Sequence, residues 1–107
     1  MTDEAEHRLL VEEIERLLLA GLCAPLDRKT RSEILHSLSA HTFASADHGV
    51  VFQALAKLPP ATPEHIREAL YARLTRLGFP DVDLEPILKL EPPSTEKIKA
   101  LLQQLRR

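Results

Sequence analysis

The chain has 107 residues, enough for one domain with a modest core and too few for two sizeable ones. Apolar residues make up 44% and charged residues 28%, a composition that is globular rather than disordered. The formal net charge of −2, with acids and bases interspersed, disfavours direct binding of nucleic acid, because such modules neutralise phosphates with a basic surface.

A single cysteine, Cys23, excludes a disulfide within the chain and favours a reducing compartment. The first residues, Met1 to Arg8, are polar and acidic, unlike a secretory signal peptide. The longest apolar run is far shorter than the roughly 20 residues of a membrane span. We therefore predict a cytoplasmic protein that does not engage a membrane.

Helical spacing of apolar residues begins near the N-terminus. The first predicted helix runs from Asp3 to about Leu19 and is ended by Gly21 and then Pro25. Its apolar face comprises Leu10, Ile14, Leu17 and Leu18. The sequence pattern assigns to its polar side Glu12, Glu13, Glu15 and Arg16.

The middle of the chain predicts two further helices. Asp27 is a suitable N-cap for a helix to about Leu38, since its carboxylate can accept a bond from a free backbone N–H. Residues 39–46 form a polar connector with Phe43 as its one large apolar anchor. Asp47 or Ser45 caps the next helix, which reaches about residue 58.

The last third predicts three helices separated by prolines. Thr62-Pro63 starts a helix to Leu77, and Gly78 provides its left-handed end, with Phe79 folding back on Leu74. Asp83 caps a short helix through residues 84–90, and Ser94 opens a final helix over about 94–106.

These elements predict an all-α fold, a single compact orthogonal bundle of about six helices over residues 1–107. The final helix follows a Pro-Pro break, so it could detach from the body. The predicted core is Leu10, Ile14, Leu17, Leu18, Ile34, Leu38, Val51, Leu55, Leu58, Ile66, Leu70, Leu74 and Leu77.

The histidines are the one cluster of metal-ligand types. His36, His41 and His48 lie within thirteen residues, close to Asp47 and not far from Cys23. Their spacing matches no zinc signature, in which paired ligands stand two apart in a turn or four apart on a helix. Local hydrogen bonding is the preferred interpretation, and a metal site stays open as the alternative.

Other catalytic patterns are missing from the sequence. Gly21, Gly49 and Gly78 are isolated, so no glycine-rich phosphate loop is formed. Cys23 lies between Leu22 and Ala24, typical of a small buried thiol. We predict no catalytic residues, no cofactor, no small-molecule substrate and no enzyme activity.

One stretch resembles a known family. Ile34-Leu35-His36-Ser37-Leu38, a loop with Phe43, and the run from Asp47 to Leu55 together look like the N-terminal domain of bacterial replicative DNA helicases. The related helicase-binding domain at the primase C-terminus is built similarly. The resemblance covers about residues 4–80, from Glu4-Ala5-Glu6 to Gly78-Phe79, and departs from the family in lacking an ATPase domain. It implies a protein–protein interaction module of DNA replication.

The leading functional prediction is therefore a non-catalytic helical interaction module that binds a protein partner or a second copy of itself. Its predicted contact residues are Phe43, Val50, Phe52, Ile98, Leu101, Leu102 and Leu105. The alternative is a small DNA-binding or regulatory helical protein, in which Arg67, Arg73, Arg76 and Lys57 would contact phosphates. A small enzyme is the third and least supported hypothesis.

Overall fold

The computed structural model describes residues 2–24, 27–58 and 63–105, and these form helices and loops without a strand. The helices are α1 (Thr2–Leu22), α2 (Arg28–Ser39), α3 (Ala46–Ala56), α4 (Pro63–Arg76), α5 (Glu85–Leu88) and α6 (Thr95–Leu105). The predicted all-α bundle is confirmed over these residues. The radius of gyration of the Cα atoms, 13.3 Å, is that of a compact chain of this length.

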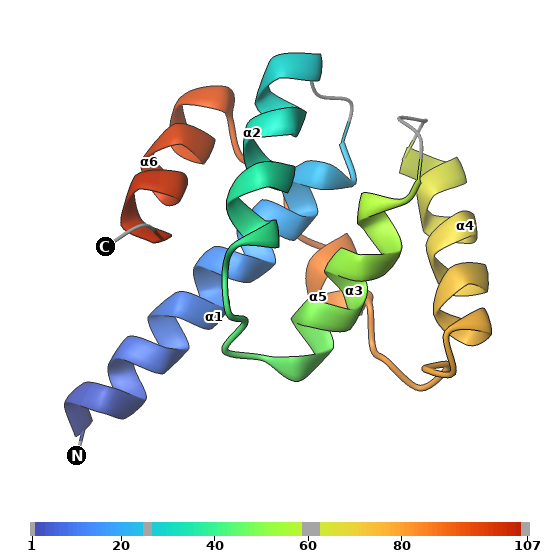
Figure 1. Ribbon diagram of the computed structural model, residues 1–107, viewed down its shortest axis with the longest axis horizontal. Helices are drawn as coiled ribbons and strands as arrows, with labels where there is room; N and C mark the ends of the chain where they lie inside the picture. Colours follow the sequence, from blue (N-terminus) through green and yellow to red (C-terminus); the bar gives the residue numbers. More distant parts are fainter. Residues whose placement is uncertain (1, 25–26, 59–62, 106–107) are drawn as a thin grey trace.

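Helix α1 is the central element. It packs against α2 and α6 on one side and against α3 and α5 on the other, and α4 packs against α3 (Figure 1). The N-terminal part of α1 extends beyond these neighbours, so that the first turns project from the body (Figure 1). This projection decides which side chains of α1 are covered and which face solvent.

Within the described residues, side-chain caps begin three of the helices. The Asp27 carboxylate accepts a 3.0 Å bond from the Thr30 N–H at the start of α2, as predicted. Ser45 rather than Asp47 caps α3, and Ser94 Oγ accepts from the N–H of the third residue of α6 at 3.2 Å. The predicted cap Thr62 lies outside the described residues.

Gly78 ends α4 in a left-handed conformation, with φ at +91°. Its N–H donates to the carbonyl of Thr75 at 3.1 Å, and the N–H of Phe79 donates to that of Leu74 at 2.8 Å. This pair of bonds is the Schellman motif, which satisfies carbonyls that the last helical turn leaves free. The predicted end of this helix is thus confirmed in its backbone.

Gly21 does not end α1, contrary to the prediction; the helix continues through Gly21 to Leu22. A Cβ at position 21 would lie 3.5 Å from Ile98 and 3.8 Å from Pro93, so glycine here lets α6 and the segment before it approach the backbone closely. A helical glycine used for close packing cannot be distinguished from a helix-ending one by local sequence.

The short helix α5 also differs from its prediction. Leu84, and not Asp83, is the N-cap of α5. Asp83 stands one residue before this cap, and its carboxylate accepts a 3.1 Å hydrogen bond from the Glu85 N–H. Pro86 sits in the first turn, where its missing N–H leaves no helical bond unmade.

The buried core agrees with the predicted apolar stripes except at two leucines. Leu10 and Leu77 are exposed, because Leu10 lies on the projecting part of α1 and Leu77 follows the last residue of α4. Leu17 and Leu58 are partly buried against the core. The largest fully buried apolar side chains are Leu18, Leu19, Leu22, Ile34, Leu38, Val51, Leu55, Leu70, Leu74, Leu84 and Ile98.

Candidate functional site

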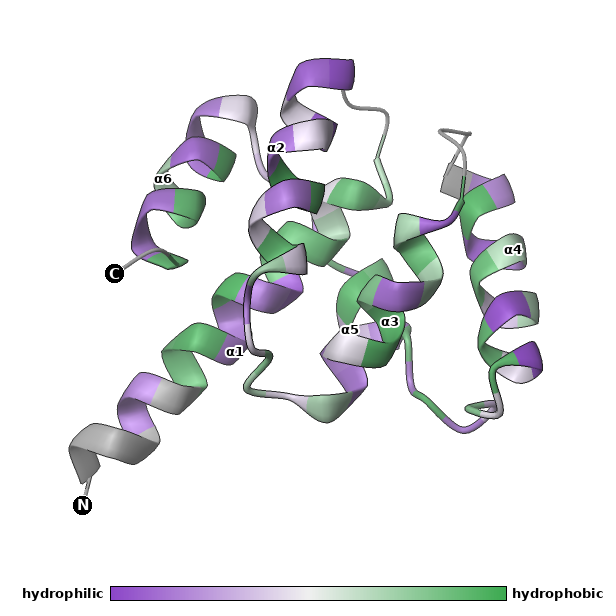
Figure 2. Ribbon diagram, in the orientation of Figure 1, coloured by the Kyte–Doolittle hydropathy of each residue, from purple (hydrophilic) through white to green (hydrophobic). Residues whose placement is uncertain are grey.

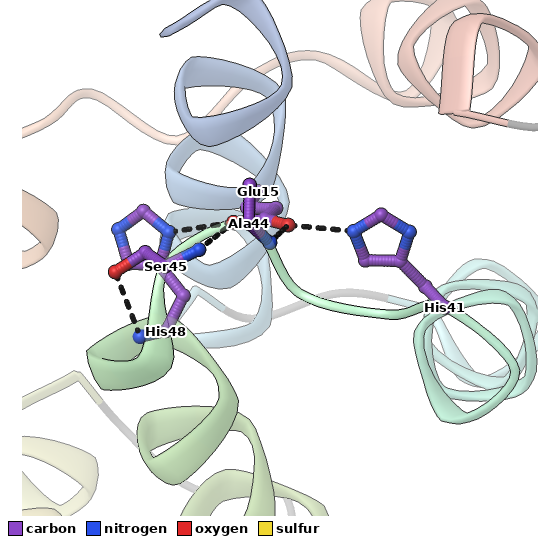
Figure 3. Close-up of polar contacts among 5 residues, drawn as sticks. All are labelled: Glu15, His41, Ala44, Ser45 and His48. Atoms are coloured by element: carbon purple, nitrogen blue, oxygen red, sulfur yellow. Dashed lines mark hydrogen bonds and ion pairs between the residues drawn. The ribbon is translucent and has the colours of Figure 1, made fainter. Parts of the chain in front are cut away.

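A buried carboxylate forms the densest polar cluster in the described part of the chain. Glu15, in the middle of α1, has no exposed surface and accepts four hydrogen bonds (Figure 3). Two come from backbone N–H groups, of Ala44 at 2.7 Å and of Ser45 at 3.3 Å. The other two come from imidazoles, His41 Nε2 at 2.6 Å and His48 Nδ1 at 2.9 Å. Every oxygen of the carboxylate therefore has a donor.

The two imidazoles approach the Glu15 carboxylate from opposite sides (Figure 3). An ionised carboxylate only accepts hydrogen bonds, so His41 must carry its proton on Nε2 and His48 on Nδ1. In each neutral ring the other nitrogen, Nδ1 of His41 and Nε2 of His48, then keeps a lone pair directed away from the carboxylate.

The hydrogen bonds decide the protonation state of Glu15. Burial raises its pKa, while bonds from His48, Ala44, His41 and Ser45 lower it. The net result is a pKa below the ordinary value of 4.5, because the donors stabilise the charged form by more than burial destabilises it. Glu15 is therefore an anion at neutral pH.

This cluster joins three parts of the chain. Glu15 belongs to α1, His41 to the connector after α2, and His48 to the first turns of α3. His41 also meets the edge of Phe43, with ring centroids 5.1 Å apart, and Phe43 lies 5.6 Å from Phe52. The cluster thus fixes the 40–45 connector over the core and supplies an anion at the N-terminal end of α3, where the helix dipole favours it.

The prediction that the histidines form hydrogen bonds is confirmed for His41 and His48. The prediction that these bonds are local is wrong, because their partner Glu15 lies 26 and 33 residues away in the sequence. His36 is exposed on α2 and does not bond Glu15. No group of three or more histidine, cysteine or acidic side chains within the described residues is arranged to hold a metal ion.

Sequence reasoning missed Glu15, which it placed on the polar side of α1. The sequence did contain a signal. Glu15 stands four residues after Val11, three residues before Leu18 and seven residues before Leu22, so it shares a helix face with them. Leu18 and Leu22 are fully buried. An acid within an apolar stripe at helical spacing predicts a buried carboxylate that needs donors from elsewhere.

A second candidate site is a groove at the surface, between the projecting part of α1 and the end of α6. One hollow there has a volume of about 330 Å³ and is lined by His7, Val11, His41, Thr42, Ala44, Gln104 and Leu105. A neighbouring hollow of about 390 Å³ is lined by His36, Ser37, Ala40, His41, Thr42 and Leu105. The two share His41, Thr42 and Leu105, and we call them together the α1–α6 groove.

Two exposed leucines lie on the projecting part of α1, and one of them, Leu10, is beside this groove. Leu9 is 64% exposed and Leu10 is 52% exposed. Figure 2 shows hydrophobic residues on the part of α1 that extends past the other helices. Around the helix, Leu10 falls between His7, which lines the groove, and Glu6, which is exposed. Leu9 stands two residues from both His7 and Val11, so it points to the opposite side of α1. The groove and Leu10 therefore form one continuous surface.

The predicted contact residues are mostly inside the molecule. Ile98, Leu101 and Leu102 are buried on the inner face of α6, and Phe52 is buried on α3. Phe43 and Val50 are partly buried against the core. In this packing only Leu105 of the set lines the α1–α6 groove. Contact through the rest of the α6 stripe would require α6 to leave the body.

The basic residues predicted to contact phosphates on α4 lie near exposed acidic residues in the structure. Arg67 and Arg76 are exposed on α4, but Glu64 and Glu68 are exposed on the same helix, and Arg73 is half-buried. Glu64 and Glu68 lie in the same turns as Arg67, so the first half of α4 has mixed charge and lacks the one-sided basic stripe typical of a DNA contact surface.

Cys23 lies against a separate hollow of about 400 Å³ between the end of α1, α4 and α5. Burial raises the pKa of its thiol to about 11, although Arg31 lowers it in part. The thiol is therefore protonated at neutral pH and a weak nucleophile.

Within the described ranges, none of the helices combines the length and the apolar character that crossing a membrane requires. Comparison of the chain with protein-family models, curated proteins and solved structures finds no match.

Proposed function

We propose that this chain is a non-catalytic helical protein–protein interaction module whose docking surface is the α1–α6 groove together with Leu10. The exposure of Leu10 on the projecting part of α1 carries the proposal. An exposed leucine that continues the apolar lining of a groove enlarges the apolar patch there, and contact sites combine such a patch with a polar rim.

The groove suits an amphipathic helix. Its apolar lining comes from Val11, Ala44 and Leu105, and its polar rim includes Thr42 and Gln104. A helix laid beside α1 would place side chains from successive turns into the two hollows, in the way that helix-in-groove binding uses residues three or four apart. The Glu15 cluster supports this surface from beneath, because it holds His41 in place.

The resemblance of residues 4–80 to replicative helicase and primase domains names a partner class to test, namely the replicative helicase or primase of the organism that encodes this chain. Calorimetric titration of each purified protein with the chain is the direct measurement. We expect one of them to bind and the Leu10→Ser variant to lose at least about tenfold in affinity, as expected for an exposed anchor residue.

A matched control is Tyr71→Ser, which removes another exposed apolar side chain from α4, away from the groove. Its binding should equal that of the wild type. Because both side chains face solvent, circular dichroism should show the same helix content in every variant. If neither helicase nor primase binds and sedimentation gives a strict monomer, the proposed function is wrong.

A further inference from the structure

The charges around the exposed leucines of α1 point to the chemistry of the partner. Glu6, Leu10, Glu13 and Leu17 stand at spacings of four, three and four residues, so they share one face of the helix. Glu6 and Glu13 are exposed, and Leu17 is partly buried. An acid therefore lies about one turn before Leu10 and about one turn after it.

The charge of this face is negative at neutral pH. Among the side chains that the structure describes, the groove edge next to it adds His7, His41, Thr42 and Gln104, and no lysine or arginine. A partner that covers Leu10 must therefore approach two carboxylates, and positive side chains flanking its apolar stripe would pair with them.

We infer that the occupant of this surface is a basic amphipathic helix of another protein, with leucine-type residues on one face and lysine or arginine on both sides of that face. This inference rests on the proposed function and adds the class of partner. The apolar face would cover Leu10 and enter the α1–α6 groove beside Val11 and Leu105. The flanking cations would reach Glu6 and Glu13, which lie on the side of Leu10 away from the groove.

A second copy of this chain fits less well. Two copies of α1 would bring the carboxylates of Glu6 and Glu13 into one interface, where like charges repel. A basic helix replaces that repulsion with attraction and needs no change in the body of the chain. The self-association outcome is kept as an arm of the test.

The experiment uses two designed peptides of about 18 residues, five helical turns, that carry leucines at helical spacing. One has lysines beside the leucines, and the other has glutamates at the same positions. Fluorescence anisotropy with the full chain should show binding of the lysine peptide and at least about tenfold weaker binding of the glutamate peptide. Raising the salt concentration from about 0.05 M to about 0.5 M should weaken the binding of the lysine peptide, because salt screens exposed charges.

Three variants locate the binding. The Glu6→Gln/Glu13→Gln variant should bind the lysine peptide more weakly, and its affinity should depend less on salt. The Leu10→Ser variant should bind the peptide more weakly at all salt concentrations. The control Glu64→Gln/Glu68→Gln removes a matched pair of exposed acids from α4 and should leave binding unchanged. Equal weakening by both glutamate pairs would mean nonspecific attraction and would overturn the inference.

Each remaining outcome also supports or overturns the inference of a basic helical partner. Equal affinity for both peptides, or binding of neither, overturns the inference that the partner is a basic helix. The titration of helicase and primase with the wild type and the Leu10→Ser variant then tests the proposed function separately. A dimer of the free chain in sedimentation that Leu10→Ser disperses shows that a second copy covers this face, which also overturns the inference. Selective binding of the lysine peptide to a monomer, lost in the α1 variants, supports it.

Discussion

At the scale of single residues, the structure depends on one buried charge. Glu15 is stable inside α1 only because four donors reach it, two of them from histidines more than twenty residues away along the chain. The face on which Glu15 lies could be predicted from the helical spacing of its apolar neighbours. Its donors could not, because the 40–45 connector has no periodicity that locates it over α1.

Replacement of Glu15 by glutamine should destabilise the fold. The amide keeps one acceptor oxygen but turns an NH₂ group toward a second set of donors, so at least one N–H loses its partner. We expect a loss of roughly 2–4 kcal/mol, the range for breaking a buried charge-assisted network. Urea unfolding at neutral pH measures it, and a loss below about 0.5 kcal/mol, typical of surface positions, would contradict the description of the cluster.

The pH dependence of the free energy of unfolding should also show the contribution of the Glu15 charge. The folded-state pKa of Glu15 is below its ordinary value of 4.5, so its contribution is fully present above pH 4.5 and is lost as the pH falls through the folded-state pKa. Wild type and Glu15→Gln should therefore differ most above pH 4.5 and converge in more acidic solution. A difference that stays constant down to the acid limit would show that the Glu15 charge does not contribute.

At the scale of elements, capping residues and prolines predicted most helix boundaries. Asp27 and Ser94 begin helices as expected, and Gly78 ends one, because caps and left-handed ends are satisfied within a few residues. Gly21 was misassigned because its role is set by α6, which packs against it from far along the sequence. Tertiary contact outweighed the local signal there.

A pair of glycine substitutions separates these roles. Gly78→Ala should destabilise the chain by about 1–2 kcal/mol, since its φ of +91° strains a residue that carries a Cβ. Gly49→Ala should be neutral or stabilising by up to about 1 kcal/mol, because its Cβ would meet Phe43 at an ordinary 3.6 Å and alanine favours the helix. Thermal unfolding of both variants checks the contrast, and equal effects would refute the assignment of the α4 end.

At the scale of the whole molecule, the important feature is that α1 is longer than the body that covers it. Sequence periodicity placed Leu10 in the core because it continues the apolar stripe of Ile14 and Leu17. Whether a stripe is covered depends on where neighbouring helices end, and that is a property of the assembled bundle. The same limit explains why the α6 residues Ile98 and Leu101, predicted as a contact surface, are instead buried.

The central claim is that the projecting part of α1 and the end of α6 form the docking surface. Amide chemical shifts in nuclear magnetic resonance, recorded while the lysine peptide is added to the full chain, test it most directly. We predict that the shifts change over residues 6–13, 41–44 and 104–105 and stay constant along α4. Changes centred on Tyr71 and the rest of α4, with α1 unaffected, would contradict the claim.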